Sequence, residues 1–364
     1  MKVTLFHEKQ TIIENCLFGV DLNPNSVKIC QLRLWIELLK HTYYKSNSKS
    51  LETLPNIDIN IKCGNSLISR FSLDEDLKPA LKKLGYTIAD YQHAVDSYRN
   101  AHNKEEKREL NQLIQTIKSG LKSEIAVKDP LLVKLRKLRG QLQSFDQAEL
   151  FEEKTTKAKK KSIEKLKKDF QRTEAQIEEI KNNAIYQNAL EWRLEFPEVL
   201  DEDGNFVGFD AIVGNPPYIR IQGLKETDSQ LADAYKDIYR SATGSYDIYS
   251  LFVERTLLLI KGNGIINFIM PTKWTNAAFG KGLRTVITEE QSISKMINFG
   301  SFQVFDASTY TGLQWFEKGS KYLQYLELEE NIVQSDDELY TFLKNINESH
   351  FNEISNESLT SEPW

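Results

Sequence analysis

The stretch Phe209-Asp210-Ala211-Ile212-Val213-Gly214-Asn215-Pro216-Pro217-Tyr218 decides the fold. Its first half, Phe209 to Val213, is a short run dominated by apolar residues, which predicts a fully buried strand. A turn, Asn215 to Tyr218, follows directly at the carboxyl end of that strand. Open α/β sheets bind their ligands at that end. The stretch therefore predicts a sheet of the α/β class with a site at this turn.

The turn itself combines rigid polar groups with an aromatic ring. Pro216 and Pro217 fix their own φ angles and restrict the residue before them. The side-chain carbonyl of Asn215 and the backbone carbonyl of Pro216 are thereby held as hydrogen-bond acceptors, and Tyr218 can stack on a planar ligand. Such a clamp suits an adenine amino group, whose lone pair is delocalised into the ring. The plainer interpretation is a tight turn, since Asn and Pro are common turn residues.

Composition limits the class of protein. The 364 residues are 40% hydrophobic, enough for one large domain or two ordinary ones, and the formal charge of −5 means that a nucleic-acid surface would be a local patch. The three cysteines and five histidines support neither a disulfide framework nor a metal site. The start of the chain lacks a signal-peptide plan, and charges interrupt the most apolar window. We expect a cytoplasmic protein without membrane contact.

Residues 1–72 predict the order helix, strand, helix, strand. Leu17 to Asp21 is a short apolar strand ending in an acid, and Asn23-Pro24 predicts the start of a helix. A carboxylate at such a strand tip can accept two hydrogen bonds from a ribose diol, although Asp21 could equally cap the helix alone. The expected buried face of this helix is Val27, Ile29, Cys30, Leu32, Leu34, Trp35, Ile36 and Leu38.

A second alternating strand is predicted from Asp58 to Leu67, with a turn at Gly64-Asn65-Ser66. The amide of Asn65 or the hydroxyl of Ser66 could bind the edge of an adenine ring, because an amide offers both a donor and an acceptor. The plainer interpretation is again a turn without a ligand.

Residues 73–194 have a different composition, rich in Lys, Glu and Gln. Apolar residues recur at helical steps, which predicts an antiparallel helical pair inserted into the core domain: Leu131, Leu135, Leu138, Leu142 and Phe145, then Ile163, Leu166, Phe170, Thr173, Ile177, Ile180 and Ala184. The second helix carries a lysine run, Lys157 to Lys168. A phosphate-contacting arm is one interpretation, but the neighbouring Glu residues favour a solvated face.

Strands and helices alternate again after the insert. We expect a helix from Tyr246 to Ile260, a turn at Gly262-Asn263-Gly264, and a buried strand from Ile265 to Met270. A helix over 279–287 and strands over 292–299 and 312–316 should follow. This order predicts a doubly wound sheet with an antiparallel edge.

In ordered motifs the chain resembles the adenine-specific (N6) DNA methyltransferases of type II restriction–modification systems, including the fused type IIG proteins. These enzymes have a class I, Rossmann-like fold and use S-adenosylmethionine. The segments that carry the resemblance are 18–24, Gly64 to Leu67, 209–220, Gly244 to Tyr249, Gly264 to Pro271 and Ser308 to Thr311. Together they span most of residues 1–317, and the ordered set is far more specific than any single member.

The resemblance implies roles for individual residues. Asp21 would hold the cofactor ribose, Leu22 would also contact the cofactor, and Asn65, Ser66 and Leu67 would lie by the cofactor adenine. The catalytic residues would be Asn215, Pro216, Pro217 and Tyr218, which hold and stack on an adenine flipped out of double-stranded DNA. Tyr310 is a candidate for a second stacking surface, although a core aromatic near a strand end is the commoner explanation.

Two departures from the family pattern concern the cofactor. Family members normally carry a glycine-rich loop about 20 residues before the ribose acid, whereas residues 1–15 contain no glycine. Asn65 also stands where many relatives have an acid. We therefore expect a fragment that lacks the first strand and the cofactor loop, binds S-adenosylmethionine poorly alone, and needs an upstream-encoded subunit.

The resulting domain plan has four parts. Residues 1–72 and 195–317 would form the methyltransferase core, residues 73–194 the helical insert, and residues 318–364 an acidic tail or the start of a truncated specificity region. A separate specificity subunit is a further expected partner. Two alternatives are an inactive or partner-binding remnant of such a system and a protein-glutamine methyltransferase, which also uses Asn-Pro-Pro-Tyr.

Overall fold

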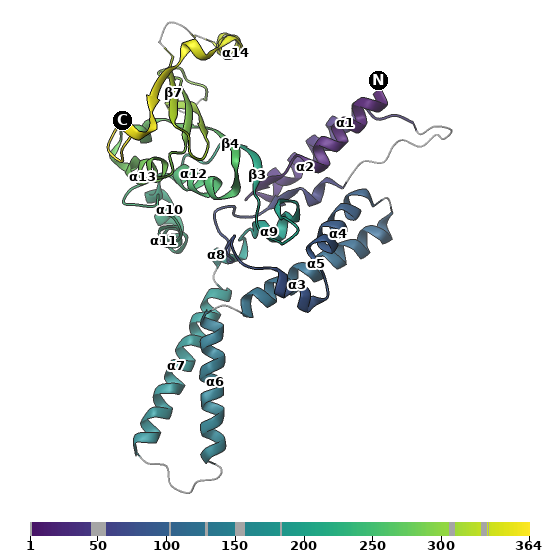
Figure 1. The fold of residues 1–364 in the computed structure, drawn as a ribbon, viewed down its shortest axis with the longest axis vertical. Coiled ribbons are helices and arrows are strands. Elements are labelled where there is room, and N and C mark those ends of the chain that lie inside the picture. The colour runs from purple at the N-terminus through teal and green to yellow at the C-terminus, as the bar shows by residue number, and fades with distance from the viewer. Residues whose placement is uncertain are drawn as a thin grey trace. The chain divides into compact units, whose positions relative to one another are not determined.

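The computed structural model describes residues 2–44, 56–101, 103–127, 130–149, 157–182, 184–305, 310–328, 333 and 335–364. Only the backbone is described at 2, 125–127, 130–132, 143–149, 157–161, 176–182, 184 and 187. The chain divides into two compact units, Met1–Phe206 and Val207–Trp364. Figure 1 shows their elements. Each unit is described by itself below.

Unit 1 begins with the predicted order of elements. Helix α1 (Lys2–Asn15) precedes strand β1 (Gly19–Asp21), helix α2 (Pro24–Leu39), a 3-10 turn η1 (Ile57–Ile59) and strand β2 (Ile61–Cys63). The two strands are parallel, with Gly19 opposite Ile61 and Asp21 opposite Cys63. The second strand is shorter than predicted because 57–59 turn into the 3-10 helix and Gly64 begins the following turn.

Helix α2 starts at the predicted cap, but fewer of its apolar side chains are buried than its pattern predicts. The Asn23 side chain accepts a hydrogen bond from the Asn25 backbone N–H at 2.9 Å, and Pro24 is the first helical residue. Val27 and Leu38 join a core with Phe6, Ile13, Ile57 and Ile61. The prediction of a wider buried face was wrong, because α1 and β2 cover only one side of α2. The exposed residues are Ile29, Cys30, Leu32 and Ile36.

The insert has more helices than the predicted pair. Helices α3 (Lys78–Leu84), α4 (Ile88–Asn100) and α5 (Lys104–Val127) pack around their own core, which includes Tyr91 and Ile117. Helices α6 (Pro130–Glu149) and α7 (Lys157–Asn182) then lie side by side as a long hairpin (Figure 1). The hairpin is followed by three short helical segments, α8 (Ala184–Gln187), α9 (Trp192–Glu195) and the 3-10 turn η2 (Pro197–Val199).

The predicted heptad residues of α6 and α7 line this hairpin where side chains are described. Leu138 and Thr173 are buried, and the half-buried ones are Leu135, Leu142, Ile163, Leu166 and Phe170. The remaining predicted positions lie outside the described side chains: Leu131, Phe145, Ile177, Ile180 and Ala184.

Unit 2 contains a six-stranded mixed sheet in the order β3-β4-β6-β5-β7-β8. The strands are β3 (Phe209–Gly214), β4 (Ile260–Pro271), β5 (Ile293–Asn298), β6 (Thr311–Phe316), β7 (Tyr322–Glu327) and β8 (Asn352–Ser355). Strand β3 is parallel to β4 and β5 to β7, whereas β6 is antiparallel to both of its neighbours. The predicted antiparallel edge is present as β8, which pairs antiparallel with β7, whereas the antiparallel strand β6 lies inside the sheet between β4 and β5.

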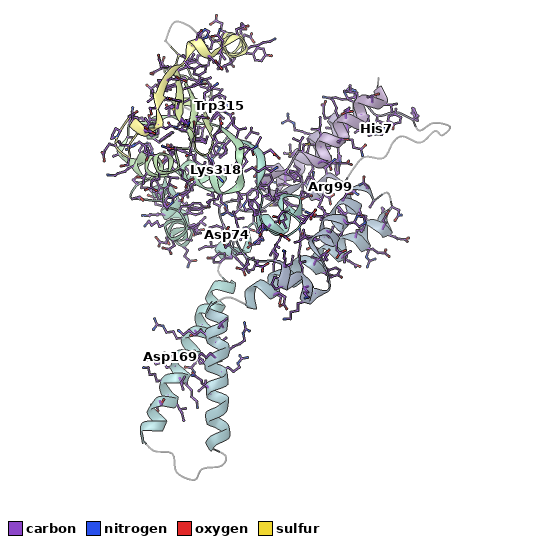
Figure 2. The ribbon with its side chains drawn as sticks, in the orientation of Figure 1. His7, Asp74, Arg99, Asp169, Trp315 and Lys318 are labelled. Carbon is purple, nitrogen blue, oxygen red and sulfur yellow. The ribbon has the colours of Figure 1, made fainter. Side chains whose placement is uncertain are left out.

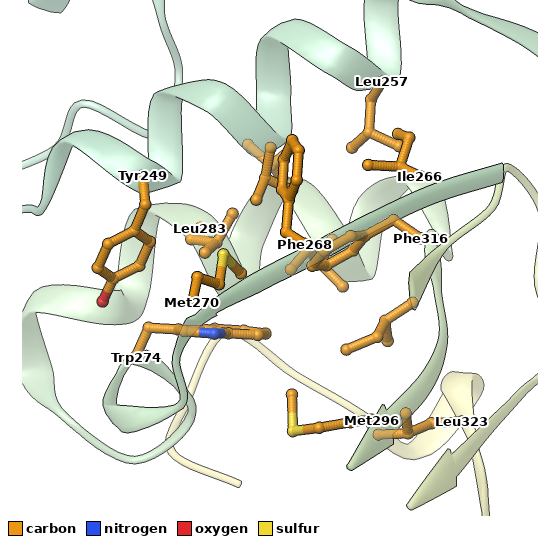
Figure 3. Packing of buried hydrophobic residues seen from close by; sticks show 14 of the residues in the cluster. Tyr249, Leu257, Ile266, Phe268, Met270, Trp274, Leu283, Met296, Phe316 and Leu323 are labelled. Atoms are coloured by element: carbon orange, nitrogen blue, oxygen red, sulfur yellow. The ribbon is translucent and has the colours of Figure 1, made fainter. Parts of the chain in front are cut away.

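The helices of unit 2 are α10 (Ile221–Thr227), α11 (Ser229–Ile238), α12 (Ile248–Leu259), α13 (Lys281–Glu290) and α14 (Asp336–Asn345). Figure 3 shows the core in which side chains of α12 and α13 pack on the sheet. Its members include Tyr249 of α12, Phe268 of β4, and Trp274 in the turn after β4. The predicted turn at Gly262-Asn263-Gly264 was wrong, because these residues lie within β4, which starts directly after α12. Helix α13 starts later than predicted, after the 3-10 turns η3 (Lys273–Thr275) and η4 (Ala278–Gly280).

Strand β3 differs most from its prediction. Instead of a fully buried strand it has four exposed residues of six, and 79% of Val213 is exposed. The strand stands at one end of the described sheet and pairs with β4 along one side. Its apolar residues therefore lack the second cover that a central parallel strand receives.

Residues 318–364, expected as an acidic tail or a truncated specificity region, supply β7, α14 and β8 to unit 2. Their last residue, Trp364, packs edge-on against Trp274 with ring centroids 5.1 Å apart. Among the described helices, none is long and apolar enough to cross a bilayer.

Candidate active site

The four residues of the turn after β3, 215–218, differ in their exposure to solvent. Asn215 and Pro217 are exposed, Pro216 is buried, and Tyr218 is half-buried. Within the described part of the chain, no hydrogen bond engages the Asn215 amide. A rigid turn with one buried proline thus holds an accessible amide at the carboxyl end of a strand.

Tyr218 is held by contacts on several sides. Its hydroxyl donates a hydrogen bond to the Ile269 carbonyl of β4 at 3.0 Å. Its ring centroid lies 6.5 Å from that of Tyr249 and 6.4 Å from that of Phe305, both in edge-on geometry. Burial raises the pKa of Tyr218 to about 12, so the hydroxyl stays protonated and can donate at neutral pH. The ring orientation is therefore set before any ligand arrives.

The segment around Asp247 braces the residues that follow Tyr218. The Ile248 N–H donates to the Ile219 carbonyl at 2.8 Å, and the Ile221 N–H donates to the Tyr246 carbonyl at 3.0 Å. These two bonds join the segments 209–220 and 244–249, which were quoted separately for the family resemblance. Burial raises the pKa of Asp247, against the lowering effects of the Tyr249 hydroxyl and the Arg220 charge.

Phe305 is the site residue that sequence reasoning missed. It lies in the loop between β5 and β6, is 37% exposed, and touches the edge of Tyr218. The signal available was an aromatic in the loop after the strand over 292–299, five residues before Tyr310. Tyr310, the residue predicted instead, is 56% exposed, and its carbonyl accepts a hydrogen bond from the Thr272 N–H at 3.0 Å. Ser308 and Thr309 lie outside the described residues.

The candidate ribose ligand Asp21 and the adjacent cofactor-binding candidate Leu22 lie at the end of β1 in unit 1. Asp21 is exposed, and its Oδ1 accepts a hydrogen bond from the Asn23 N–H at 2.7 Å. Leu22 is 59% exposed. The carboxylate of Asp21 thus helps to set the start of α2 and still faces solvent, so both interpretations of this residue are compatible with the geometry.

The turn after β2 is tied to the chain segment before α9. The Asn65 N–H donates to the Asn188 carbonyl at 2.6 Å, and the Trp192 indole N–H donates to the Ser66 carbonyl at 3.2 Å. Within the turn, the Asn65 side-chain oxygen accepts from the Leu67 N–H at 3.0 Å. Leu67 is buried, whereas Asn65 and Ser66 are half-buried. The side chain of Leu67 is thus part of the core of unit 1.

The described residues contain no group of three or more His, Cys, Asp or Glu side chains placed to hold a metal ion.

Comparison with known proteins assigns these motifs to one family. The family described as Eco57I restriction-modification methylase matches residues 15–305. The chain belongs to this restriction-modification methylase family. The match includes Asp21, the turn 64–67, the turn 215–218 and Phe305, so the family spans both units.

Curated relatives are restriction–modification proteins. One from Methanocaldococcus jannaschii, provisionally named a type II restriction enzyme and methyltransferase, is 27% identical over 334 residues and matches 84% of this chain and 26% of its own length. The Escherichia coli type II restriction enzyme and methyltransferase RM.Eco57I is 40% identical over 111 residues, which are 30% of this chain and 11% of that protein. The chain thus spans about a quarter or less of these relatives.

Among solved structures, the ATP-dependent type ISP restriction-modification enzyme LlaBIII bound to DNA is 18% identical with a TM-score of 0.33, and the match covers 61% of this chain and 19% of that one.

Proposed function

We propose that this chain carries the base-binding and catalytic residues of a type II DNA adenine-N6 methyltransferase that uses S-adenosylmethionine. The observation that supports this most is the accessible Asn215 amide on a rigid turn, next to a Tyr218 ring that β4 holds in place. Family membership supports DNA methylation, and the adenine specificity rests on the chemistry of this turn.

The proposed reaction places the adenine amino group against the turn. The Asn215 side-chain oxygen and the Pro216 carbonyl accept hydrogen bonds from the two N–H groups. As the nitrogen becomes tetrahedral, these acceptors stabilise the positive charge that develops on it. When bound, S-adenosylmethionine supplies a methyl group attached to a positively charged sulfur. In the transfer, the amino nitrogen held by these acceptors would form its new bond to the donated methyl carbon as the bond from that carbon to sulfur breaks, and one amino proton would then pass to solvent.

The adenine must leave the duplex before it can reach this turn. Flipping a base costs a few kcal/mol, which stacking partly offsets. Tyr218 would stack on the flipped adenine, and Phe305 or Tyr310 would supply a second aromatic surface.

The cofactor would be held by residues of unit 1. The solvent-facing carboxylate of Asp21, with Leu22 beside it, fits the two hydroxyls of a ribose. Asn65 and Ser66 would contact the cofactor adenine, and Leu67 would support them from the core. A glycine-rich loop supplied by a separate segment is the expected complement to these residues, and a specificity subunit is a further proposed partner.

The test is transfer of tritiated methyl groups from S-adenosylmethionine to duplex DNA. It is run with the chain alone and with the product of any adjacent upstream reading frame. Asn215→Ala should lower transfer by about 100-fold or more, the usual cost of removing a charge-stabilising hydrogen-bond partner. Asn263→Ala, an exposed Asn on β4, is the matched control and should leave transfer unchanged.

Two results would contradict the proposal. Equal methyl transfer by the wild type and Asn215→Ala would show that the Asn215 side chain has no role in catalysis. Label that appears in a protein acceptor and never in DNA would favour the protein-glutamine alternative. Calorimetric titration with S-adenosylmethionine, run in parallel, separates loss of cofactor binding from loss of chemistry.

A further inference from the structure

The hairpin of α6 and α7, residues 130–182, differs in charge from the rest of the chain, and we name it the basic arm. It contains fourteen Lys and Arg residues against nine Asp and Glu, a net charge of +5. The whole chain carries −5, so the residues outside the arm carry −10. Positive charge is therefore concentrated on one pair of helices.

The described basic side chains of the arm are exposed. Residues 133–142 of α6 contain four basic residues and no acid: Lys134, Arg136, Lys137 and Arg139, all exposed. On α7, Lys165, Lys168 and Arg172 are exposed at spacings of three and four, so they share one face of the helix. Figure 2 shows the side chains of this region around Asp169.

The described lysines of the arm differ in their contacts from its Arg139. Among the described residues, Lys134, Lys137, Lys165 and Lys168 make no ion pair, although Glu164, Glu174 and Asp169 are nearby in sequence. Arg139, by contrast, lies over the Phe170 ring at 5.7 Å and ties the two helices together. The plainer expectation for this lysine run, a solvated helix face, agrees with the exposure of Lys165, Lys167 and Lys168, and exposure also leaves these side chains accessible to a partner.

The start of α7 adds an electrostatic cost. Its first turn holds no acidic residue. Four of its first five residues are lysines: Lys157, Lys159, Lys160 and Lys161. Cations at a helix N-terminus are destabilised by the helix dipole. A polyanion placed along the arm would relieve that repulsion.

We propose that the basic arm binds the phosphate backbone of double-stranded DNA. A 20-residue helix such as α6 is about 30 Å long, close to one helical turn of B-DNA. The arm offers mainly positive charge, so it would contribute affinity and orientation while carrying no sequence information. The choice of DNA as the polyanion rests on the proposed function, whereas binding by the arm is measured without methyl transfer.

The test compares two charge-matched variants of the full chain by fluorescence anisotropy on a labelled DNA duplex at several salt concentrations. The arm variant replaces Lys134, Lys137, Lys165 and Lys168 by Gln. The control replaces four exposed lysines outside the arm by Gln: Lys82, Lys104, Lys122 and Lys321. The arm variant should bind at least tenfold more weakly at 100 mM salt, and its slope of log affinity against log salt should fall by about one for each phosphate that a lysine no longer neutralises.

Circular dichroism and thermal melting check that both variants fold like the wild type. Equal affinity and salt slope in the arm and control variants would overturn the proposal, as would absence of DNA binding by the wild type. If DNA binding depends on the arm while no methyl transfer is found, the arm proposal stands and the proposed function fails. If Asn215→Ala abolishes transfer while the arm variant binds DNA normally, only the arm proposal fails.

Discussion

Tyr218 and Phe305 show how far single residues can be predicted. The chemistry of Asn215 to Tyr218 is local, because two prolines fix the turn whatever surrounds it. The contact of Tyr218 with Phe305, 87 positions later, depends on how β4, β5 and β6 pair. The sequence therefore predicts the turn, whereas the contact of Phe305 with Tyr218 could not be predicted from local patterns.

Lys62 on β2 provides a prediction about pH. Burial, with the nearby Lys118 charge, lowers its pKa from 10.5 to about 8, although Glu195 partly offsets this. Between pH 8 and 10 the unfolded chain keeps this proton while the folded chain has lost it. The stability of unit 1 should therefore rise over this range, by about 2 kcal/mol from this group.

Urea unfolding at pH 8 and pH 10 checks this prediction, with Lys62→Met as the comparison. The variant keeps the Lys118–Glu195 ion pair of 2.7 Å and lacks the titrating amine, so its rise with pH should be smaller by that amount. An equal rise in both proteins would mean that Lys62 is not the group responsible.

At the scale of elements, Gly282 allows helix α13 to pack closely against the backbone of Ser241. A Cβ at Gly282 would clash with the backbone of Ser241, beginning with its carbonyl oxygen. Gly282→Ala should lower the free energy of unfolding of unit 2 by about 1–3 kcal/mol, because neither backbone can move freely. Thermal melting followed by circular dichroism measures the change.

Gly223 in α10 is the matched control, since a Cβ there would meet no atom within 4 Å. Gly223→Ala should be neutral or stabilising by up to about 1 kcal/mol, as alanine is the better helix former. A similar loss of stability in both variants would point to a general effect of substitution instead of the contact with Ser241.

At the scale of the whole molecule, each unit has hydrophobic clusters of its own. Unit 1 has one around Phe6 and Ile13 and another around Tyr91, and unit 2 has clusters around Trp274 and Phe299. Ile13→Ala should cost about 2–5 kcal/mol by leaving a cavity in unit 1.

Hydrogen–deuterium exchange of this variant should speed up in peptides from α1, α2, β1 and β2. Exchange in β3 to β8 should stay as in the wild type, because the substituted core belongs to unit 1 alone. Faster exchange throughout 207–364 would show that the two units unfold together.

Sequence by itself determined the local features of this protein. It identified the cap at Asn23-Pro24, the order of elements in residues 1–72, the two long helices of the insert and the Asn-Pro-Pro-Tyr turn. These depend on residues within a few positions of one another, so caps, periodicity and proline geometry suffice. The motif order was enough to indicate the family.

Only the tertiary structure decided the exposure of Val213, the interior place of β6 and the meeting of Phe305 with Tyr218. Burial of a strand depends on the strands beside it, and those neighbours come from distant parts of the chain. The exposure of the described lysines of the basic arm likewise became visible only with the side chains of α6 and α7. Pairing between distant segments is a property of the folded chain, which no local pattern encodes.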